Sequence, residues 1–184
     1  MPGGRRVLGL APLPRGVQLQ SLGSVSDSAD SIALGRSRFE FAQFNLVCSR
    51  PGTLRGMHVH ACREDSFTVL SGALLIALAD VRDGPGFERV SLFELAASTP
   101  QTLIIPAGVL HGFYSPGPSK VLYGLSKEWD PRDELGCIWN DPSLSIPWPC
   151  AAPTLSVRDA ALGSYEQLVG EWRCRIAELT EDAP

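Results

Sequence analysis

Apolar and polar residues alternate along many short segments of this chain, which is the pattern typical of β-strands. In the first such segment, Arg38–Leu46, aromatic side chains alternate with polar ones. Turn signals rich in Gly and Pro separate the segments that follow. These expected strands are Thr53–Val59, Ser66–Leu70, Ala73–Arg82, Glu88–Glu94, Gln101–Ile105, Gly112–Tyr114 and Lys120–Ser126. Many short strands at this spacing predict an all-β sandwich or barrel.

The two ends of the chain depart from this pattern. Residues 1–36 are rich in Gly, Pro, Ser and Ala and show weak periodicity, so we expect a loosely ordered arm with one strand near Val17–Leu22. Apolar residues recur at helical spacing from Ser164 to Leu179, which predicts a C-terminal helix packed on the barrel. A length of 184 residues suits one domain, with the barrel over residues 37–163 and the helical segment over 164–184.

Composition and charge exclude several classes of function. The chain carries 20 acidic and 16 basic residues, a net charge of −4, whereas binding to nucleic acid needs a basic face. No apolar run is long enough to span a bilayer. The five cysteines are scattered and form no C-x-x-C pair, which argues against a disulfide framework or a structural zinc site. We therefore expect a cytoplasmic protein that binds neither nucleic acid nor a membrane.

All three histidines fall in two short segments. His58 and His60 are separated by one residue on an expected strand, so both imidazoles point to the same face. In a barrel that face is the interior, where His111, which follows the Pro106-Ala107-Gly108 turn, can meet them. The two segments resemble the two motifs of cupin barrels. This resemblance implies an all-β double-stranded β-helix, or jelly roll, with a short C-terminal helix.

From about Arg38 to Ala161 the chain resembles the dTDP-4-dehydrorhamnose 3,5-epimerases, a cupin family of nucleotide-sugar epimerases. The sequence Leu54-Arg55-Gly56-Met57-His58 is similar to the Arg-Gly-Leu-His strand of that family. Further motifs follow in the family's order: Asp80–Arg82, Ile105–Phe113, Leu122–Tyr123, Trp139–Pro142, Ile146–Pro149 and Leu155–Asp159. The resemblance implies an isomerase or epimerase that acts on a keto-sugar, nucleotide-linked in this family, through an enolate. It also implies a homodimer and a reaction that needs no cofactor.

The resemblance assigns roles to individual residues. His58 would be the base that removes a proton next to the sugar ketone, and Asp159 would orient and stabilise its imidazole. Tyr123 would return a proton on the opposite face. The implied substrate-binding residues are Arg55 and His111 near the keto oxygen or the diphosphate, Gln43 and Asn45 on the nucleotide side, and His60.

Three departures from the family pattern affect this chemistry. The N-terminal arginine that clamps the diphosphate in the family has no clear counterpart. His60 stands where the family has glutamine. The family's lysine, which stabilises the enolate, aligns near Asp65, and a carboxylate there would repel an enolate oxygen unless another group supplies positive charge.

A bound metal would supply that charge, which leaves a second interpretation open. His58, His60, Glu64 and His111 match the three-histidine, one-carboxylate set of metal-binding cupins, with Asp65 as the other choice of carboxylate. Imidazole and carboxylate suit Fe, Mn, Ni, Cu or Zn and do not select among them. Such a protein would be a metal-dependent oxygenase, isomerase or lyase that acts on a small molecule. A sugar-binding cupin without catalytic activity is the third alternative.

Overall fold

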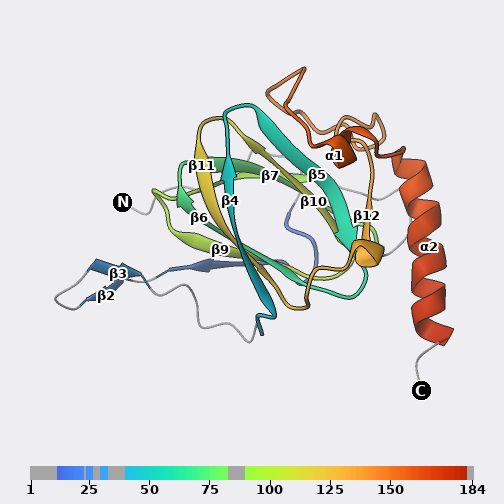
Figure 1. The fold of residues 1–184 in the computed structure, drawn as a ribbon, viewed down its shortest axis with the longest axis horizontal. Coiled ribbons are helices and arrows are strands. Elements are labelled where there is room, and N and C mark those ends of the chain that lie inside the picture. The colour runs from blue at the N-terminus through green and yellow to red at the C-terminus, as the bar shows by residue number, and fades with distance from the viewer. Residues whose placement is uncertain (1–11, 23, 27–29, 33–39, 83–89, 182–184) are drawn as a thin grey trace.

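The computed structural model of the chain describes residues 12–22, 24–26, 30–32, 40–82 and 90–181. Two antiparallel five-stranded sheets pack face to face into a barrel (Figure 1). The first sheet has the order β1 (Gln18–Ser21), β9 (Gln101–Ile105), β6 (Asp65–Ser71), β11 (Ser119–Leu125), β4 (Gln43–Ser49). The second has the order β12 (Glu134–Gly136), β5 (Thr53–His60), β10 (Val109–Ser115), β7 (Ala73–Asp80), β8 (Ser91–Ala96).

From β4 to β12 the chain passes from one sheet to the other at every step except between β7 and β8. This winding is that of a double-stranded β-helix, and it confirms the predicted fold class. A separate pair, β2 (Ser24–Ser26) and β3 (Asp30–Ile32), lies outside both sheets. The helical elements are η1 (Pro131–Asp133), α1 (Val157–Ala160) and α2 (Tyr165–Glu181).

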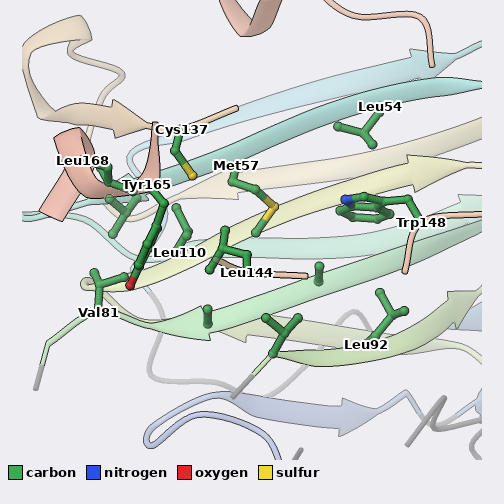
Figure 2. Packing of buried hydrophobic residues seen from close by; sticks show 14 of the residues in the cluster. Leu54, Met57, Val81, Leu92, Leu110, Cys137, Leu144, Trp148, Tyr165 and Leu168 are labelled. Carbon is green, nitrogen blue, oxygen red and sulfur yellow. The ribbon is translucent and has the colours of Figure 1, made fainter. Parts of the chain in front are cut away.

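The second sheet is buried on both faces, as β7 shows most clearly. Its residues Leu74, Ile76 and Leu78 belong to a cluster between the two sheets, together with side chains from β6, β9 and β11. The alternate residues of β7 belong to a cluster on the outer face, which the segment after β12 and helix α2 cover (Figure 2). In a strand buried on both faces every side chain is removed from water, which explains the nearly continuous apolar run Ala73–Ala79.

Helix α2 confirms the helix predicted from the spacing of apolar residues. Its buried side chains Tyr165, Leu168 and Trp172 pack into the outer cluster. None of the described helices has the length and the apolar run that crossing a lipid bilayer requires. All five cysteines lie in the described residues as free thiols, as their scatter along the chain predicts.

Several strand boundaries differ from the prediction. The first long strand, β4, begins at Gln43 rather than near Arg38, which lies outside the described residues. Of the strand expected at Glu88–Glu94, residues 88–89 also lie outside them, and β8 runs from Ser91 to Ala96. The strand expected near Val17–Leu22 is confirmed as β1, and it belongs to the barrel because it pairs in register with β9. Isolated β1 carries too little apolar pattern to reveal that pairing.

Candidate active site

A cavity of about 580 Å³ is lined by residues of both sheets. It brings together five of the predicted site residues, namely Asn45, Arg55, His58, His111 and Tyr123. Two others stand one step behind the lining. Gln43 donates a hydrogen bond to the side-chain oxygen of Asn45 at 3.1 Å, and the imidazole of His60 is buried beside His111.

A local irregularity in β5 places Arg55 and His58 in the same cavity. Strict alternation would put residues three positions apart on opposite faces. The pairing of β5 with β10 shifts register between His111 and Phe113, so Leu54 and Met57 both face the outer cluster. Gly56 permits this geometry, because its φ is +119° and a Cβ there would lie 2.6 Å from the Cα of Gly112. The glycine of the Arg-Gly-Met-His motif therefore sets the direction of the side chains around it.

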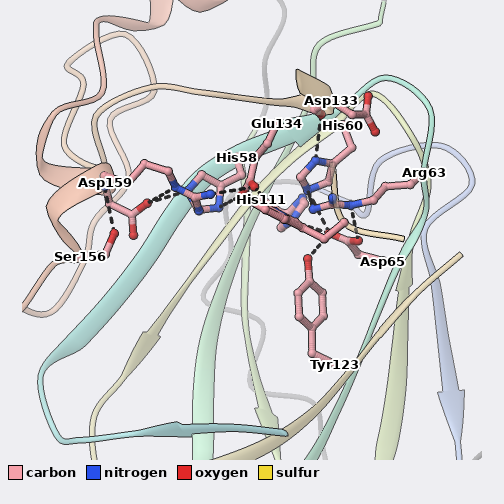
Figure 3. A network of polar contacts seen from close by, with 12 residues as sticks. His58, His60, Arg63, Asp65, His111, Tyr123, Asp133, Glu134, Ser156 and Asp159 are labelled. Atoms are coloured by element: carbon pink, nitrogen blue, oxygen red, sulfur yellow. Dashed lines mark hydrogen bonds and ion pairs between the residues drawn. The ribbon is translucent and has the colours of Figure 1, made fainter. Parts of the chain in front are cut away.

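His58 forms a pair with Asp159. The carboxylate is 2 % exposed and its Oδ1 lies 2.7 Å from Nε2 of His58 (Figure 3). Ser156 caps helix α1 and accepts a hydrogen bond from the backbone N–H of Asp159, which holds the carboxylate in place. Since an ionised carboxylate only accepts, Nε2 donates, and Nδ1 is left as the basic nitrogen of the neutral ring.

The pKa values of this pair suit a general base. Burial lowers the pKa of His58, against the opposing effect of Asp159 and Glu134, so the ring is neutral at neutral pH. Burial alone would raise the pKa of Asp159, but the hydrogen bond with His58 outweighs it and lowers that pKa. A neutral imidazole next to an ionised carboxylate can accept a proton.

Three further residues at this end of the cavity, Glu134, Arg158 and Trp129, were not predicted. Glu134 places Oε1 3.5 Å from Nδ1 of His58, and its Oε2 accepts from Nη1 of Arg158 at 2.7 Å. Trp129 also donates to Oε2 of Glu134 through its indole nitrogen, at 2.7 Å. The sequence could have pointed to Arg158 as a site residue, because it directly precedes the predicted Asp159. No pattern in the sequence pointed to Glu134, because β12 is only three residues long and reaches His58 by pairing with β5.

Asp65 is the centre of a second polar cluster, and it is 1 % exposed. Its Oδ2 lies 3.1 Å from Nε2 of His60 and 3.1 Å from Nε2 of His111. The same oxygen accepts a hydrogen bond from the hydroxyl of Tyr123 at 2.7 Å. The guanidinium of Arg63 approaches the other oxygen, with Nε 3.3 Å from Oδ1. Figure 3 shows Tyr123 and the two imidazoles converging on this carboxylate.

Burial, hydrogen bonds and neighbouring charges change the pKa values of Asp65 and Tyr123 in this cluster. Burial alone would raise the pKa of Asp65, but the adjoining imidazoles of His111 and His60 outweigh it and hold that pKa well below its ordinary value. Burial and the negative charge of Asp65 together raise the pKa of Tyr123 well above its ordinary value. Asp65 is therefore ionised, and Tyr123 keeps its proton.

The structure does not bring the four residues predicted as a metal site into one group. Among the described residues, the ligand atoms that lie within 4.8 Å of one another belong to His60, Asp65 and His111. His58 and His60 are two residues apart, about 7 Å along a strand, and each imidazole takes its own carboxylate. Glu64 is exposed and bonds to Ser126 through its backbone: its N–H donates to the hydroxyl of Ser126, and its carbonyl accepts from the backbone N–H of Ser126.

A cation of the protein itself, Arg63, lies next to the remaining group of His60, Asp65 and His111. Nη2 of Arg63 lies 3.0 Å from Nε2 of His60, and the same guanidinium contacts Asp65. A divalent ion between these ligands would stand beside a fixed positive charge, which works against binding. The geometry therefore favours a cluster of hydrogen bonds and ion pairs over a metal centre.

The winding of the two sheets and the histidines inside them define a cupin barrel. The family model for dTDP-4-dehydrorhamnose 3,5-epimerase matches residues 23–167, and the chain belongs to this family. The dTDP-4-dehydrorhamnose 3,5-epimerase of Mycobacterium tuberculosis is 34% identical over an alignment of 134 residues, and the match covers 68% of this chain and 66% of that protein. The matched segment thus spans just under two thirds of that relative.

Two solved structures share the fold along most of their length. The rmlC epimerase of Mycobacterium tuberculosis is 27% identical, with a TM-score of 0.74 over 89% of this chain and 98% of that one. ChmJ, a 3'-monoepimerase from Streptomyces bikiniensis solved in complex with dTDP-quinovose, is also 27% identical. Its TM-score is 0.75, over 86% of this chain and 87% of that one.

Proposed function

We propose that this protein epimerises or isomerises a nucleotide-linked keto-sugar by proton transfer through an enolate. One observation carries the proposal. His58, on β5 of the second sheet, and Tyr123, on β11 of the first sheet, line the same cavity from its two walls. A proton removed from one face of a carbon and returned from the other inverts that carbon, so an epimerase needs a base and an acid on opposite sides.

His58 is the base in this mechanism. Its Nδ1 takes the proton from the carbon next to the ketone, and the electron pair of the broken C–H bond moves onto the keto oxygen. The imidazolium that forms lies between two carboxylates, with Asp159 at Nε2 and Glu134 near Nδ1. These negative charges stabilise the protonated ring in the intermediate.

Tyr123 is the acid that returns a proton to the other face of the carbon. Its raised pKa keeps the hydroxyl protonated, and the ring of Phe67 packs against it with 4.8 Å between centroids. In the structure that hydroxyl donates to Asp65, so delivery to carbon requires it to turn from the carboxylate to the substrate. Protons move only between side chains and substrate, and the proposed reaction needs no cofactor.

The remaining predicted residues fit the nucleotide end of such a substrate. Arg55 and the half-exposed Arg158 are cations of the cavity lining and suit a diphosphate. Asn45, fixed by Gln43, offers an amide on the same lining. The complex of the related 3'-monoepimerase with dTDP-quinovose supports a dTDP-linked sugar as the substrate class.

Hydrogen exchange in D2O tests this function directly. The protein is incubated with dTDP-linked 4-keto-6-deoxyhexoses, and NMR follows the loss of carbon-bound hydrogen next to the ketone. We expect exchange at one or two carbons, which also distinguishes epimerisation at one centre from epimerisation at two. A protein that exchanges no carbon-bound hydrogen in any of these sugars is not an epimerase of this class.

We also propose a homodimer, because two-fold dimers are the commonest oligomers. Edge strand β4 supports this assembly, since it exposes Phe44 and Leu46, which are 53 % and 62 % accessible to solvent. Sedimentation velocity at micromolar concentration should give the mass of two chains. The mass of a single chain at that concentration contradicts the proposal.

A further inference from the structure

The proposed chemistry creates a negative charge that the structure has to stabilise. In the proposed mechanism an enolate oxygen forms in this cavity, and one of its walls carries Tyr123, which is held by Asp65. A buried carboxylate there raises the energy of that oxygen, and by resemblance the family has a lysine near this position. The epimerase function therefore requires another cation on the same wall.

Arg63 is a buried cation on that wall. It is 3 % exposed, yet it lines the cavity. Two of its three guanidinium nitrogens are held in place: Nε lies 3.3 Å from Oδ1 of Asp65, and Nη2 lies 3.0 Å from Nε2 of His60. The third, Nη1, is buried without a hydrogen-bond partner. Buried donors are nearly always satisfied, so an unpaired one next to a cavity points to a ligand atom.

From this arrangement, and from the function proposed above, we propose that Arg63 is the cation that stabilises the enolate oxygen. Asp65 and His60 are then positioning residues that fix the plane of the guanidinium. Nη1 donates to the oxygen as negative charge develops on it. The charge that the family's lysine supplies by resemblance comes here from a residue two positions earlier in the chain.

The local charge balance agrees with this role. Arg63 offsets the negative charge of Asp65. Both nitrogens of His111 face oxygen acceptors, with Nδ1 3.0 Å from the carbonyl of Val109 and Nε2 3.1 Å from Oδ2 of Asp65. Neither nitrogen of His111 is therefore free of an oxygen contact, whereas Nη1 of Arg63 has no hydrogen-bond partner. Arg63 is thus the group of this cluster that can offer both a positive charge and an unpaired donor to an enolate oxygen.

Binding of the diphosphate is the competing role for a buried arginine, and kinetics separates the two. A group that contacts only the enolate acts in the transition state, so its removal lowers kcat and leaves KM unchanged. A group that holds the diphosphate acts equally in the ground state, so its removal raises KM and weakens binding of dTDP. Binding of dTDP, which lacks the sugar, is thus a measurement that an enolate role does not alter.

The experiment compares Arg63→Gln and Arg63→Lys with Arg173→Gln, which makes the same change at an exposed position of α2. We expect Arg63→Gln to lower kcat for D2O exchange about 100-fold, the loss typical for one donor to an oxyanion. KM and the Kd for dTDP should stay within about twofold. Arg63→Lys keeps the charge and should recover part of kcat, and Arg173→Gln should match the unmodified protein.

A double variant moves the cation to the family's position. Arg63→Gln combined with Asp65→Lys removes the carboxylate and restores a positive charge on the first residue of β6. It should exchange at least about tenfold faster than Arg63→Gln alone. Circular dichroism and urea unfolding report whether each variant folds.

The outcomes separate failure of this inference from failure of the function. An unmodified protein that exchanges no keto-sugar overturns both. If the unmodified protein exchanges, an unchanged kcat in Arg63→Gln, or a loss confined to KM and dTDP binding, overturns the role of Arg63 alone. If Arg63→Gln does not fold, Arg63→Lys decides: a lowered kcat with unchanged dTDP binding supports the role, and the reverse result overturns it.

Discussion

Two histidine–carboxylate pairs lie in one cavity and have different surroundings. His58 lies 2.7 Å from Asp159, and His111 lies 3.1 Å from Asp65. The free nitrogen of His58 has only Glu134 nearby, at 3.5 Å, so this ring can take up a proton. Both nitrogens of His111 lie within hydrogen-bond distance of protein oxygens, on Val109 and Asp65, so neither is left over for the substrate. The comparison shows that the partners of a pair, more than its distance, decide whether it acts as a base.

The carboxylates of the two pairs differ in the same way. The carboxylate of Asp159 contacts one imidazole, and the backbone N–H of Asp159 donates to the capping residue Ser156 at the start of a short helix. Asp65 accepts from Tyr123 and is surrounded by Arg63 and two imidazoles. The first carboxylate tunes a base, whereas the second organises a wall of hydrogen-bond donors. Changes at the two carboxylates should therefore have different consequences, and the following predictions test that difference.

Removal of the base should have the largest effect. His58→Asn keeps a similar shape but has no basic nitrogen, so exchange of carbon-bound hydrogen in D2O should slow about 10³-fold. NMR of a keto-sugar substrate measures the rate. Binding of dTDP and stability to urea should match the unmodified protein. Exchange at an undiminished rate would show that another group removes the proton.

Asp159→Asn should lower the rate less, about 10²-fold, because the base remains while its tautomer and charge partner are lost. The dependence of kcat/KM on pH provides the second measurement. In the unmodified protein activity falls on the acid side as His58 becomes protonated, with a midpoint below that of an ordinary histidine because its pKa is lowered. Loss of the carboxylate disfavours the imidazolium, so the acid limb should move to still lower pH. A limb that moves upward would contradict the pairing.

Asp65→Asn should act mainly on stability, since it leaves the buried Arg63 without its charge partner. The free energy of unfolding at neutral pH should fall by about 3 kcal/mol or more. Because the folded-state pKa of Asp65 is lowered, its contribution is present above the ordinary aspartate pKa and is lost as pH falls below it. Urea unfolding between about pH 5 and pH 2 should accordingly show a shallower loss in the variant.

The matched control for Asp65 is Asp130, which also pairs with an arginine, Arg132, but at the surface. Asp130→Asn should leave the stability measured with urea unchanged, because exposed ion pairs contribute little. Equal effects at the two positions would mean that burial of the Asp65 cluster does not determine its strength.

His60→Gln should have the smallest effect on catalysis, with a rate within about fivefold of the unmodified protein, because His60 only positions Arg63 in the proposed mechanism. Elemental analysis of both proteins adds the decisive control. Less than about a tenth of an equivalent of any transition metal is expected in either. Activity that falls in proportion to bound metal would instead support a metal site at His60, Asp65 and His111.

The sequence carried most of the information about the fold. Alternation and turn signals predicted the strands from Thr53 to Leu125, and helical spacing predicted α2. The weakest predictions were those whose pairing partner is distant. β1 and β12 contribute four and three residues, and each is held in a sheet by a strand at least 70 positions away in sequence. Local patterns of that length do not specify a partner.

The features of the candidate site also divide into those that the sequence predicted and those that depend on distant strands. The sequence by itself predicted an all-β sandwich or barrel, because strand periodicity and turn signals are local properties. The resemblance of its motifs to the epimerase family implied the double-stranded β-helix and the dyad of His58 and Asp159. Tertiary structure alone decided that Asp65 rather than Glu64 lies inside, that Glu134 reaches His58, and that the Arg63 guanidinium lies against the imidazole of His60 and the carboxylate of Asp65. Those facts depend on register between distant strands and on which side chains desolvate together, and no local pattern encodes either.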